Sequence, residues 1–252
     1  MIKVLICGIN GAMGKVLSEC IADSNVFALA CGCDIAEGDN FGVHIYADIA
    51  KITEPVDIVI DFSHFSAAKK ITSWCVEKRL PLVSAVTGID DDTLSFIKEA
   101  SKKIPVFRAD NFSYGVSVLK RLLESASQML AEGYDIELIE AHHNKKKDSP
   151  SGTANMLLDT IDAAVKEKRK RVYGRYGTDS KRQKNDIGVH SIRGGSVVGE
   201  HEILFCGEGE VISLRHSALS KKVLAQGALK AAAYTVAKQN GFYDMEDMLN
   251  EQ

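Results

Sequence analysis

Short apolar runs alternate with amphipathic helical patterns through residues 1–107, and this alternation constrains the fold more than any other feature of the chain. The apolar runs occupy residues 2–9, 27–34, 56–62, 81–85 and 104–107. Helical spacing of apolar residues occupies 12–23, 66–78 and 91–102. Strands that alternate with helices form a parallel sheet, because each helical crossover returns the chain to the same edge. The sequence therefore predicts an α/β domain.

The pattern changes beyond this region. Helical spacing covers residues 115–131 and 152–168, an apolar strand covers 134–142, and a strand-rich run covers 188–216. We expect these elements to form a separate α+β domain. An alanine-rich amphipathic helix at 221–239 follows, and it could return to the first domain.

The composition is that of an ordinary globular protein. The chain has 252 residues, of which 45% are hydrophobic and 26% are charged, with a formal net charge of −3. No apolar run approaches the ~20 residues of a membrane span, and the apolar opening at 1–6 leads into glycines instead of a cleavage site. We therefore expect a cytoplasmic protein that has no membrane partner.

A stretch dense in lysine and arginine covers residues 166–184. Nucleic-acid binding is one interpretation of such a stretch. A solvated helix end followed by an exposed loop is the simpler one, because acidic residues balance these cations over the whole chain. We expect no nucleic-acid partner.

The six cysteines contain no CxxC pair and lie mostly in apolar stretches, which is typical of reduced core residues. Cys31 and Cys33 share one face of a strand, so a zinc or redox site is an alternative, but no partners stand at ligand spacing. Glu140 and His142 also share a strand face, and a third metal ligand is missing. We therefore expect no metal.

A glycine motif joins the first apolar run to the first helix. It reads Gly8-Ile-Asn-Gly-Ala-Met-Gly14, and Asp34 ends the second strand 20 residues beyond Gly14. In this context glycines let the backbone approach a pyrophosphate, and the acid accepts hydrogen bonds from a ribose. The alternative is a tight βα turn with an incidental aspartate. We expect a Rossmann-type domain that binds a dinucleotide through Gly8, Asn10, Gly11, Ala12, Met13, Gly14 and Asp34.

The residue after Asp34 bears on cofactor choice. The charge of Asp34 repels a 2′-phosphate, and Ile35 follows it where an arginine would offset that repulsion. We expect NADH to be favoured, with NADPH possible if a cation reaches in from elsewhere in the fold.

A second motif runs from Glu137 to Thr153. A strand ends in His142 and His143, a loop with three lysines follows, and Ser151-Gly-Thr opens a helix. Helix amides and lysine charge suit an anionic substrate, and a histidine can supply a proton. The alternative is one structural histidine, one exposed histidine and a solvated turn.

The segment Glu140-Ala-His-His-Asn-Lys-Lys-Lys-Asp-Ser-Pro-Ser-Gly-Thr-Ala154 closely resembles the signature of the 4-hydroxy-tetrahydrodipicolinate reductases, also called dihydrodipicolinate reductases, of bacterial lysine and diaminopimelate synthesis. The resemblance extends over essentially the whole chain. It includes residues 8–14, 86–88, 110–113, 193–201 and 242–249.

This resemblance implies reduction of a cyclic, unsaturated dicarboxylate imine by NAD(P)H, giving tetrahydrodipicolinate. It implies catalytic roles for His142 as proton donor and for Lys146 as a helper that also binds substrate. The implied substrate-binding residues are His143, Ser151, Gly152 and Thr153. The implied nicotinamide contacts are Ala85, Thr87, Gly88, Asp110, Asn111 and Phe112.

The resemblance also implies an architecture. The family has a discontinuous dinucleotide-binding domain, here 1–112 with 218–252, and a central mixed-sheet domain, here 113–217, that builds a homotetramer. Two departures from the family matter: Ile35 stands where members that use NADPH well often carry a basic residue, and Ala85-Val-Thr-Gly stands where many relatives read Gly-Thr-Thr-Gly. Two other functions stay open, a related amino-acid or sugar dehydrogenase and a nicotinamide-sensing module without chemistry.

Overall fold

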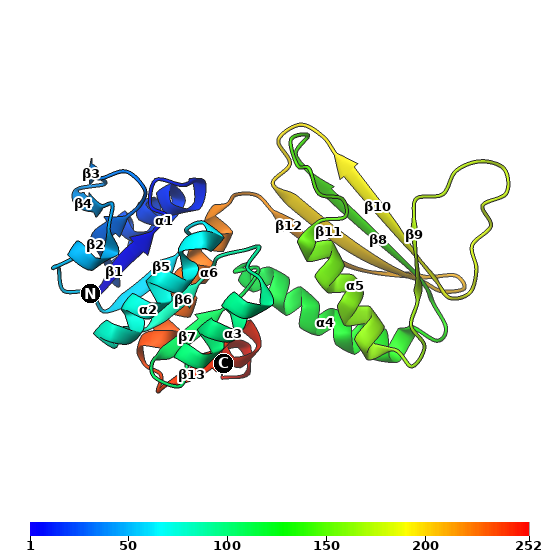
Figure 1. Cartoon of the computed structure of the whole chain (residues 1–252). Helices are drawn as coiled ribbons and strands as arrows, with labels where there is room; N and C mark the ends of the chain where they lie inside the picture. Colours follow the sequence, from blue (N-terminus) through cyan, green and yellow to red (C-terminus); the bar gives the residue numbers. More distant parts are fainter. Residues whose placement is uncertain (252) are drawn as a thin grey trace. The chain divides into compact units, whose positions relative to one another are not determined.

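The computed structural model describes residues 1–251 and divides the chain into two compact units (Figure 1). Unit 1 contains Met1–Tyr114 and the chain from Lys221 onward, and unit 2 contains Gly115–Ser220. The chain therefore leaves unit 1 after Tyr114 and returns to it at Lys221, whereas the sequence-based boundaries lie after residues 112 and 217.

Unit 1 is built on an eight-stranded sheet with the order β13-β7-β6-β5-β1-β2-β4-β3. The strands are β1 Ile2–Cys7, β2 Phe27–Cys33, β3 Gly38–Asn40, β4 Val43–Tyr46, β5 Ile58–Asp61, β6 Leu82–Ser84, β7 Pro105–Arg108 and β13 Gly241–Tyr243. Neighbouring strands run parallel except for β3 and β4. Because β1 lies between β2 and β5, the strand order reverses at β1, which is where open parallel sheets bind ligands.

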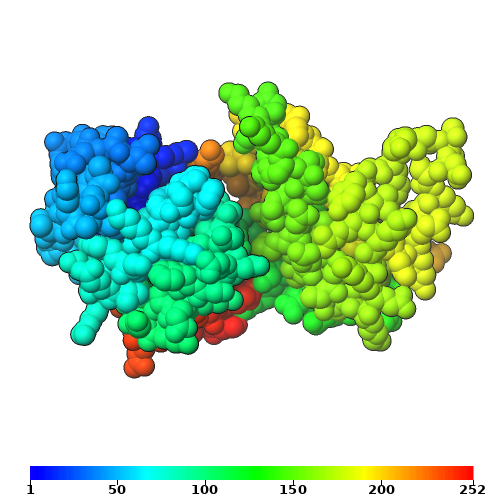
Figure 2. All heavy atoms as spheres, viewed as in Figure 1, coloured from blue at the N-terminus to red at the C-terminus, as the bar shows by residue number. Residues whose placement is uncertain are grey.

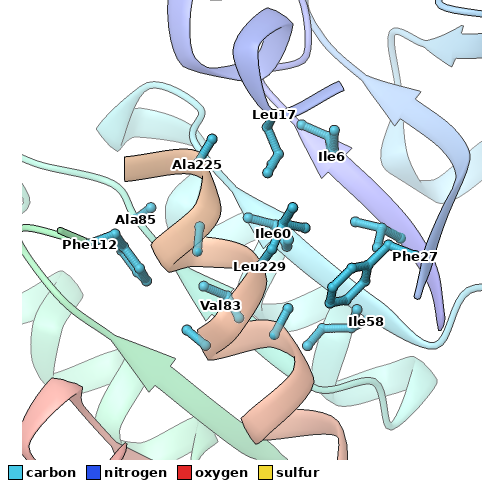
Figure 3. Packing of buried hydrophobic residues seen from close by; sticks show 14 of the residues in the cluster. Ile6, Leu17, Phe27, Ile58, Ile60, Val83, Ala85, Phe112, Ala225 and Leu229 are labelled. Atoms are coloured by element: carbon cyan, nitrogen blue, oxygen red, sulfur yellow. The ribbon is translucent and has the colours of Figure 1, made fainter. Parts of the chain in front are cut away.

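Helices cover both faces of this sheet. They are α1 Ala12–Ala22, α2 Ala68–Lys78, α3 Asp91–Ala100, α6 Lys222–Val236 and α7 Met245–Asn250, with short 3₁₀ turns at Ile49–Lys51 and Phe65–Ala67. Figure 3 shows Leu229 of α6 beside Ile60 and Val83 of the sheet, and Ala225 of the same helix belongs to the same buried cluster. Buried alanines on α6 let the helix approach the sheet closely, so the returning segment belongs to the core of unit 1.

Unit 2 is built on a mixed five-stranded sheet with the order β12-β11-β8-β10-β9. The strands are β8 Asp135–His142, β9 Lys170–Tyr173, β10 Asp186–Arg193, β11 Gly199–Cys206 and β12 Val211–Ala218. β10 runs parallel to β8 and β9, and β11 runs antiparallel to β8 and β12. The helices α4 Tyr114–Leu130 and α5 Gly152–Ala164 contribute to the same core as this sheet. The predicted α/β class with a second, mixed-sheet domain is confirmed.

One face of β8 positions the candidate chemistry. Ile136 and Leu138 are fully buried in the core formed with α4 and α5. Side chains alternate across a strand, so Glu140 and His142 continue the same face. The hydrophobic pattern of β8 therefore fixes the direction in which both polar side chains point.

The basic stretch at 166–184 differs from its sequence interpretation in one respect. The helix predicted for 152–168 ends at Ala164, and the edge strand β9 begins at Lys170. Arg171 of β9 pairs with Asp159 and Asp162 of α5, at 2.5 and 2.8 Å. The loop after β9 is exposed at residues 176–181, and it protrudes from unit 2 in Figure 2.

Other general features of the described residues concern the cysteines, groups of metal-ligating side chains and helix length. All six cysteines are free thiols, and Cys7, Cys31 and Cys75 are buried. Within residues 1–251, no group of three or more potential ligands is arranged to hold a metal ion. Over the same residues, every helix is too short or too polar to cross a bilayer.

Candidate active site

The glycine loop after β1 forms a tight turn into α1. Gly8 has a φ of +78° and donates its N–H to the carbonyl of Cys33 at 2.8 Å, and Gly11 donates to the carbonyl of Gly8 at 3.0 Å. Helix α1 begins at Ala12, and Gly11 caps it without a side-chain hydrogen bond. An uncapped helix start of this kind directs amide donors and the positive end of the helix dipole at an anion.

Space in this loop is restricted at two of its three glycines. A Cβ on Gly14 would lie 2.3 Å from the Gly8 carbonyl oxygen and 2.5 Å from the backbone of Ile9. A Cβ on Gly8 would lie 2.7 Å from the carbonyl oxygen of Phe62, whereas one on Gly11 would lie 3.1 Å from its nearest neighbour. Gly14 therefore provides the close helix–strand packing of the dinucleotide fingerprint, and the loop fits a pyrophosphate.

Asp34 lies beside this loop, directly after β2. Its Oδ2 accepts the Asn10 N–H at 2.8 Å, and its Oδ1 accepts the Ile35 N–H at 2.7 Å. The side chain of Ile35 is exposed. The carboxylate is therefore fixed against the glycine loop, where an acid can accept hydrogen bonds from ribose hydroxyls.

The predicted nicotinamide contacts follow β6 and β7, whose carboxyl ends lie on the same edge of the sheet as that of β1. Ala85 donates its N–H to the carbonyl of Asp61 at 2.9 Å, and Gly88 has a φ of +72°. Asp110 pairs with the largely buried Arg108 at 2.7 Å. The structure thus brings the residues predicted around 85–88 and 110–112 to one edge of unit 1.

Contacts of Phe112 hold the loop at residues 110–112 in place. Its ring is buried, with centroids 6.1 Å from Phe62 and 5.9 Å from Phe107. A Cβ on Gly227 of α6 would lie 1.6 Å from the Phe112 carbonyl oxygen. Sequence reasoning missed Phe62 and Gly227, because Phe62 carries no motif and Gly227 lies 115 residues after Phe112 in an ordinary helical pattern.

Asp61 is a further polar group at this edge that the sequence did not single out. It is 1% exposed, it lies directly opposite Cys7 of β1, and it accepts the Ser63 N–H at 2.9 Å. Burial raises the pKa of Asp61 to about 6, although the hydrogen bonds from Ser63 act in the opposite direction. Asp61 is therefore a weaker acid than an ordinary aspartate.

In unit 2, Glu140 lies at the centre of a hydrogen-bonded cluster. Its Oε2 contacts His142 Nδ1 at 2.6 Å, and its two oxygens accept from the guanidinium of Arg193 at 2.6 and 2.8 Å. The Ser151 N–H donates to Oε1 at 3.2 Å. Glu140 and His142, considered above as metal ligands, thus meet as hydrogen-bond partners, and Arg193 supplies the countercharge.

His201 of β11 packs against this cluster. Its ring centroid lies 5.3 Å from that of His142, and its Nε2 lies 3.0 Å from Ser151 Oγ. Burial first, and then the nearby charge of His142, lower the pKa of His201 to about 4, so this ring is neutral near pH 7. Sequence reasoning assigned no role to His201 or Arg193.

Ser151 is expected to contact substrate, and the structure gives its hydroxyl internal partners. The side chain is 2% exposed, and its Oγ accepts the Ala154 N–H at 3.1 Å as the N-cap of α5. Gly152, the first residue of α5, is exposed and has open space around its Cα. The start of α5 is therefore held from inside by Ser151 and is accessible at Gly152.

One of the three lysines in the loop differs from the other two. Lys145 and Lys147 are exposed, whereas Lys146 is partly buried and its Nζ pairs with Asp148 at 2.9 Å. This pairing lowers the pKa of Asp148. The Lys146 N–H also donates to the carbonyl of His143 at 3.1 Å, which closes a turn. Lys146 is thus the lysine of this loop with a fixed environment.

Both halves of the chain match family models of known proteins. The family described as "Dihydrodipicolinate reductase, N-terminus" matches residues 2–112, and "Dihydrodipicolinate reductase, C-terminus" matches residues 115–249. The 4-hydroxy-tetrahydrodipicolinate reductase of Clostridium tetani is 45% identical over 250 residues, covering 99% of this chain and 98% of the relative. That of Caldanaerobacter subterraneus is 42% identical, covering 100% and 99%.

A solved structure agrees with these matches. The dipicolinate-bound dihydrodipicolinate reductase of Paenisporosarcina sp. TG-14 superposes with a TM-score of 0.80 at 21% identity, covering 97% of each chain. At this identity the likeness shows the shared fold, while the sequence matches show the family. The resemblance predicted from the sequence is confirmed, and the chain belongs to the dihydrodipicolinate reductase family.

Proposed function

We propose that the chain is an NAD(P)H-dependent 4-hydroxy-tetrahydrodipicolinate reductase, which reduces a dihydrodipicolinate-type cyclic imine to tetrahydrodipicolinate in lysine and diaminopimelate biosynthesis. The observation that carries this proposal is the full-length match to reductases of this name. In unit 1, the tight packing at Gly14, which leaves no room for a side chain, and the position of Asp34 beside the glycine loop fit a dinucleotide. The direct test is NADH oxidation with freshly generated dihydrodipicolinate.

In the proposed reaction the cofactor supplies the hydride and the protein supplies the proton. The nicotinamide supplies a hydride to the conjugated imine when the cofactor is bound. Addition leaves negative charge on the neighbouring carbon and nitrogen system, so a positioned proton source lowers the barrier. His142 is the proton donor in this proposal, because its imidazole is held by Glu140 and its side chain remains partly exposed.

The substrate carboxylates need positive charge and hydrogen-bond donors. The start of α5 at Gly152 and Thr153 supplies amides at a helix N-terminus, and Lys146 supplies an ammonium. His143 lies one residue beyond the end of β8 and is half-buried. These residues form the proposed dicarboxylate site, with Ser151 supporting it from inside.

Lys146→Ala should weaken dicarboxylate binding at least tenfold, because the variant loses the one partly buried ammonium of the loop. Dipicolinate, the ligand bound to the related reductase, is a suitable probe for titration. NADH affinity should stay near wild type, because the glycine loop and Asp34 lie in unit 1.

Lys147→Ala is the matched control, since it removes the same charge from an exposed neighbour. The assignment is wrong if both variants bind dipicolinate equally well. It is also wrong if Lys146→Ala loses NADH affinity as strongly as dicarboxylate affinity.

NADH should be at least as good a donor as NADPH. Asp34 is fixed beside the glycine loop and Ile35 is exposed and apolar, so neither neighbour offsets a 2′-phosphate. The measurement is kcat/KM for both donors under identical conditions. A strong preference for NADPH would contradict this prediction.

If NADPH is preferred, Lys70 is the first candidate for a contact with the 2′-phosphate. The pKa of Cys33, the residue before Asp34, is lowered first by its hydrogen bond with Cys7 and also by the charge of Lys70. Lys70 itself pairs with Asp48 at 2.9 Å. A preference for NADPH that Lys70→Ala abolishes would assign the phosphate contact to Lys70.

We also propose that the protein is a cytoplasmic homotetramer, in which subunits contact one another through unit 2. The core of unit 2 forms between its helices and one face of its sheet. Ile192 and Val211, which lie on strands of this sheet, remain 53% and 60% exposed. Exposed apolar side chains on a sheet are typical of interfaces between subunits. Analytical ultracentrifugation of the purified protein tests the assembly.

A further inference from the structure

Glu140 and His142 are linked by a short hydrogen bond on one strand face. They are two residues apart on β8, and Glu140 Oε2 lies 2.6 Å from His142 Nδ1. Glu140 is fully buried, whereas the His142 side chain is 12% exposed. The carboxylate thus contacts the ring from the protein interior.

The other contacts of Glu140 keep it ionised. Arg193, on the parallel neighbour β10, donates to both carboxylate oxygens, and the Ser151 N–H donates to one of them. Burial raises the pKa of Glu140, but hydrogen bonds from Arg193 and His142 outweigh burial and lower the pKa to about 2. A carboxylate that is ionised throughout the working pH range has no proton to donate, so the proton of this hydrogen bond is on His142 Nδ1.

We propose that Glu140 is a positioning residue, which fixes the Nδ1–H form of His142 and stabilises its imidazolium, so that the transferable proton is always the one on Nε2. This inference rests on the proposed role of His142 as proton donor. The Nε2–H bond breaks, its electron pair stays on Nε2, and the proton goes to the anion that hydride addition creates. The ring is left neutral with Nδ1–H still bonded to Glu140, and solvent restores the Nε2 proton.

The surroundings of the ring agree with this assignment. A Cβ on Gly199 of β11 would lie 3.2 Å from His142 Nε2, so the absence of a side chain there keeps that nitrogen clear. The charged and titratable groups facing the ring come from every neighbouring element. They are Glu140 on β8, Arg193 on β10 and His201 on β11, with His216 on β12 opposite His201, and the paired Lys146 and Asp148 in the loop after β8.

Among these groups, Glu140 is the carboxylate in direct contact with the His142 ring. The pKa of His201 is lowered, first by burial, and burial also lowers the pKa of His216, so both rings are neutral near pH 7. Arg193 is a cation bonded to Glu140, and the charge of Lys146 is paired with Asp148. Removing the Glu140 carboxylate therefore removes the negative charge in direct contact with the His142 ring, while Arg193 stays.

A matched control lies on the opposite face of the same strand. Glu137 of β8 pairs with Arg175 at 2.9 Å and with His190 Nε2 at 2.8 Å. It therefore has the same kinds of partner as Glu140, an arginine and a histidine, but its side chain alternates to the other face of β8. Glu137→Gln removes an equivalent charge without touching His142.

The first measurement needs no variant. Long-range ¹H–¹⁵N spectra of the ¹⁵N-histidine-labelled full chain, assigned with His142→Gln, report which nitrogen of the neutral ring carries the proton. We expect Nδ1–H in the wild type and in Glu137→Gln. A wild-type His142 ring protonated on Nε2 would overturn the proposal, whether or not the Glu140 variants fold.

The second measurement is the pH profile of kcat/KM. Because the imidazolium is the acid, the rate falls at high pH, and loss of the carboxylate that stabilises the charged ring should move this alkaline limb to lower pH. Glu140→Gln should also lower kcat at least tenfold near pH 7, with NADH affinity unchanged. An unshifted profile in folded Glu140→Gln, or an equal shift in Glu137→Gln, would overturn the proposal.

The His142 and Glu140 variants distinguish the proton-donor role from the positioning role. Full activity of His142→Gln would overturn the proton-donor assignment and the catalytic consequence for Glu140 together. A slow His142→Gln variant beside a fully active, folded Glu140→Gln variant would overturn the positioning role alone.

Discussion

His142→Gln should lower kcat by about two orders of magnitude or more and leave NADH binding near wild type. General acid catalysis contributes about 10²- to 10⁴-fold, and glutamine keeps a similar shape without a transferable proton. The ring lies in unit 2, whereas the glycine loop lies in unit 1, so cofactor affinity has no reason to change. Single-turnover rates and NADH fluorescence titration separate the two effects.

The pH dependence gives a second, independent readout for this variant. The wild-type profile of kcat/KM should contain an ionisation that His142→Gln lacks. Turnover close to wild type would instead assign the proton to Lys146 or to water. His190→Gln serves as control, because His190 Nε2 bonds Glu137, on the opposite face of the sheet.

Gly14→Ala should destabilise unit 1 by about 3 kcal/mol or more and abolish tight NADH binding. In an ordinary helix, the same change would stabilise the protein by about 1 kcal/mol. Here the new Cβ would lie 2.3 Å from the Gly8 carbonyl oxygen and 2.5 Å from the Ile9 backbone, so β1 and α1 must separate. The sign of the change in unfolding free energy, measured by urea denaturation, is therefore diagnostic.

Gly11→Ala is the companion variant. Its Cβ would lie 3.1 Å from the Gly8 carbonyl oxygen, and Gly11 has a φ of −68°, which alanine adopts readily. We expect a loss of about 1 kcal/mol, mainly from replacing glycine at a helix N-cap. Equal losses of stability in both variants would contradict the packing role assigned to Gly14.

The main architecture of unit 1 was predictable because buried parallel strands are nearly continuous apolar runs. The missed elements are short or polar. The β3–β4 hairpin has strands of three and four residues, and β9 reads Lys-Arg-Val-Tyr within a charged stretch. Pairing with neighbouring strands, rather than local sequence preference, makes these segments extended.

The candidate site was predictable where a motif is local. The glycine loop and Asp34 belong to one βαβ pattern, and the segment from Glu140 to Thr153 is continuous. Arg193 reaches Glu140 only because β10 pairs in parallel with β8, 53 residues apart in the sequence. The shared strand face of Glu140 and His142 was visible in the sequence, yet their chemistry depends on this distant arginine.

The most direct test of the proposed function is a steady-state assay of NADH oxidation with freshly generated dihydrodipicolinate. We expect saturable oxidation that depends on the substrate and is lost in His142→Gln. Turnover of hydroxy or amino acids in its place would favour a related dehydrogenase. Tight NADH binding with no oxidation of dihydrodipicolinate by the folded wild-type chain would contradict the proposed reductase function and indicate a nicotinamide-binding module.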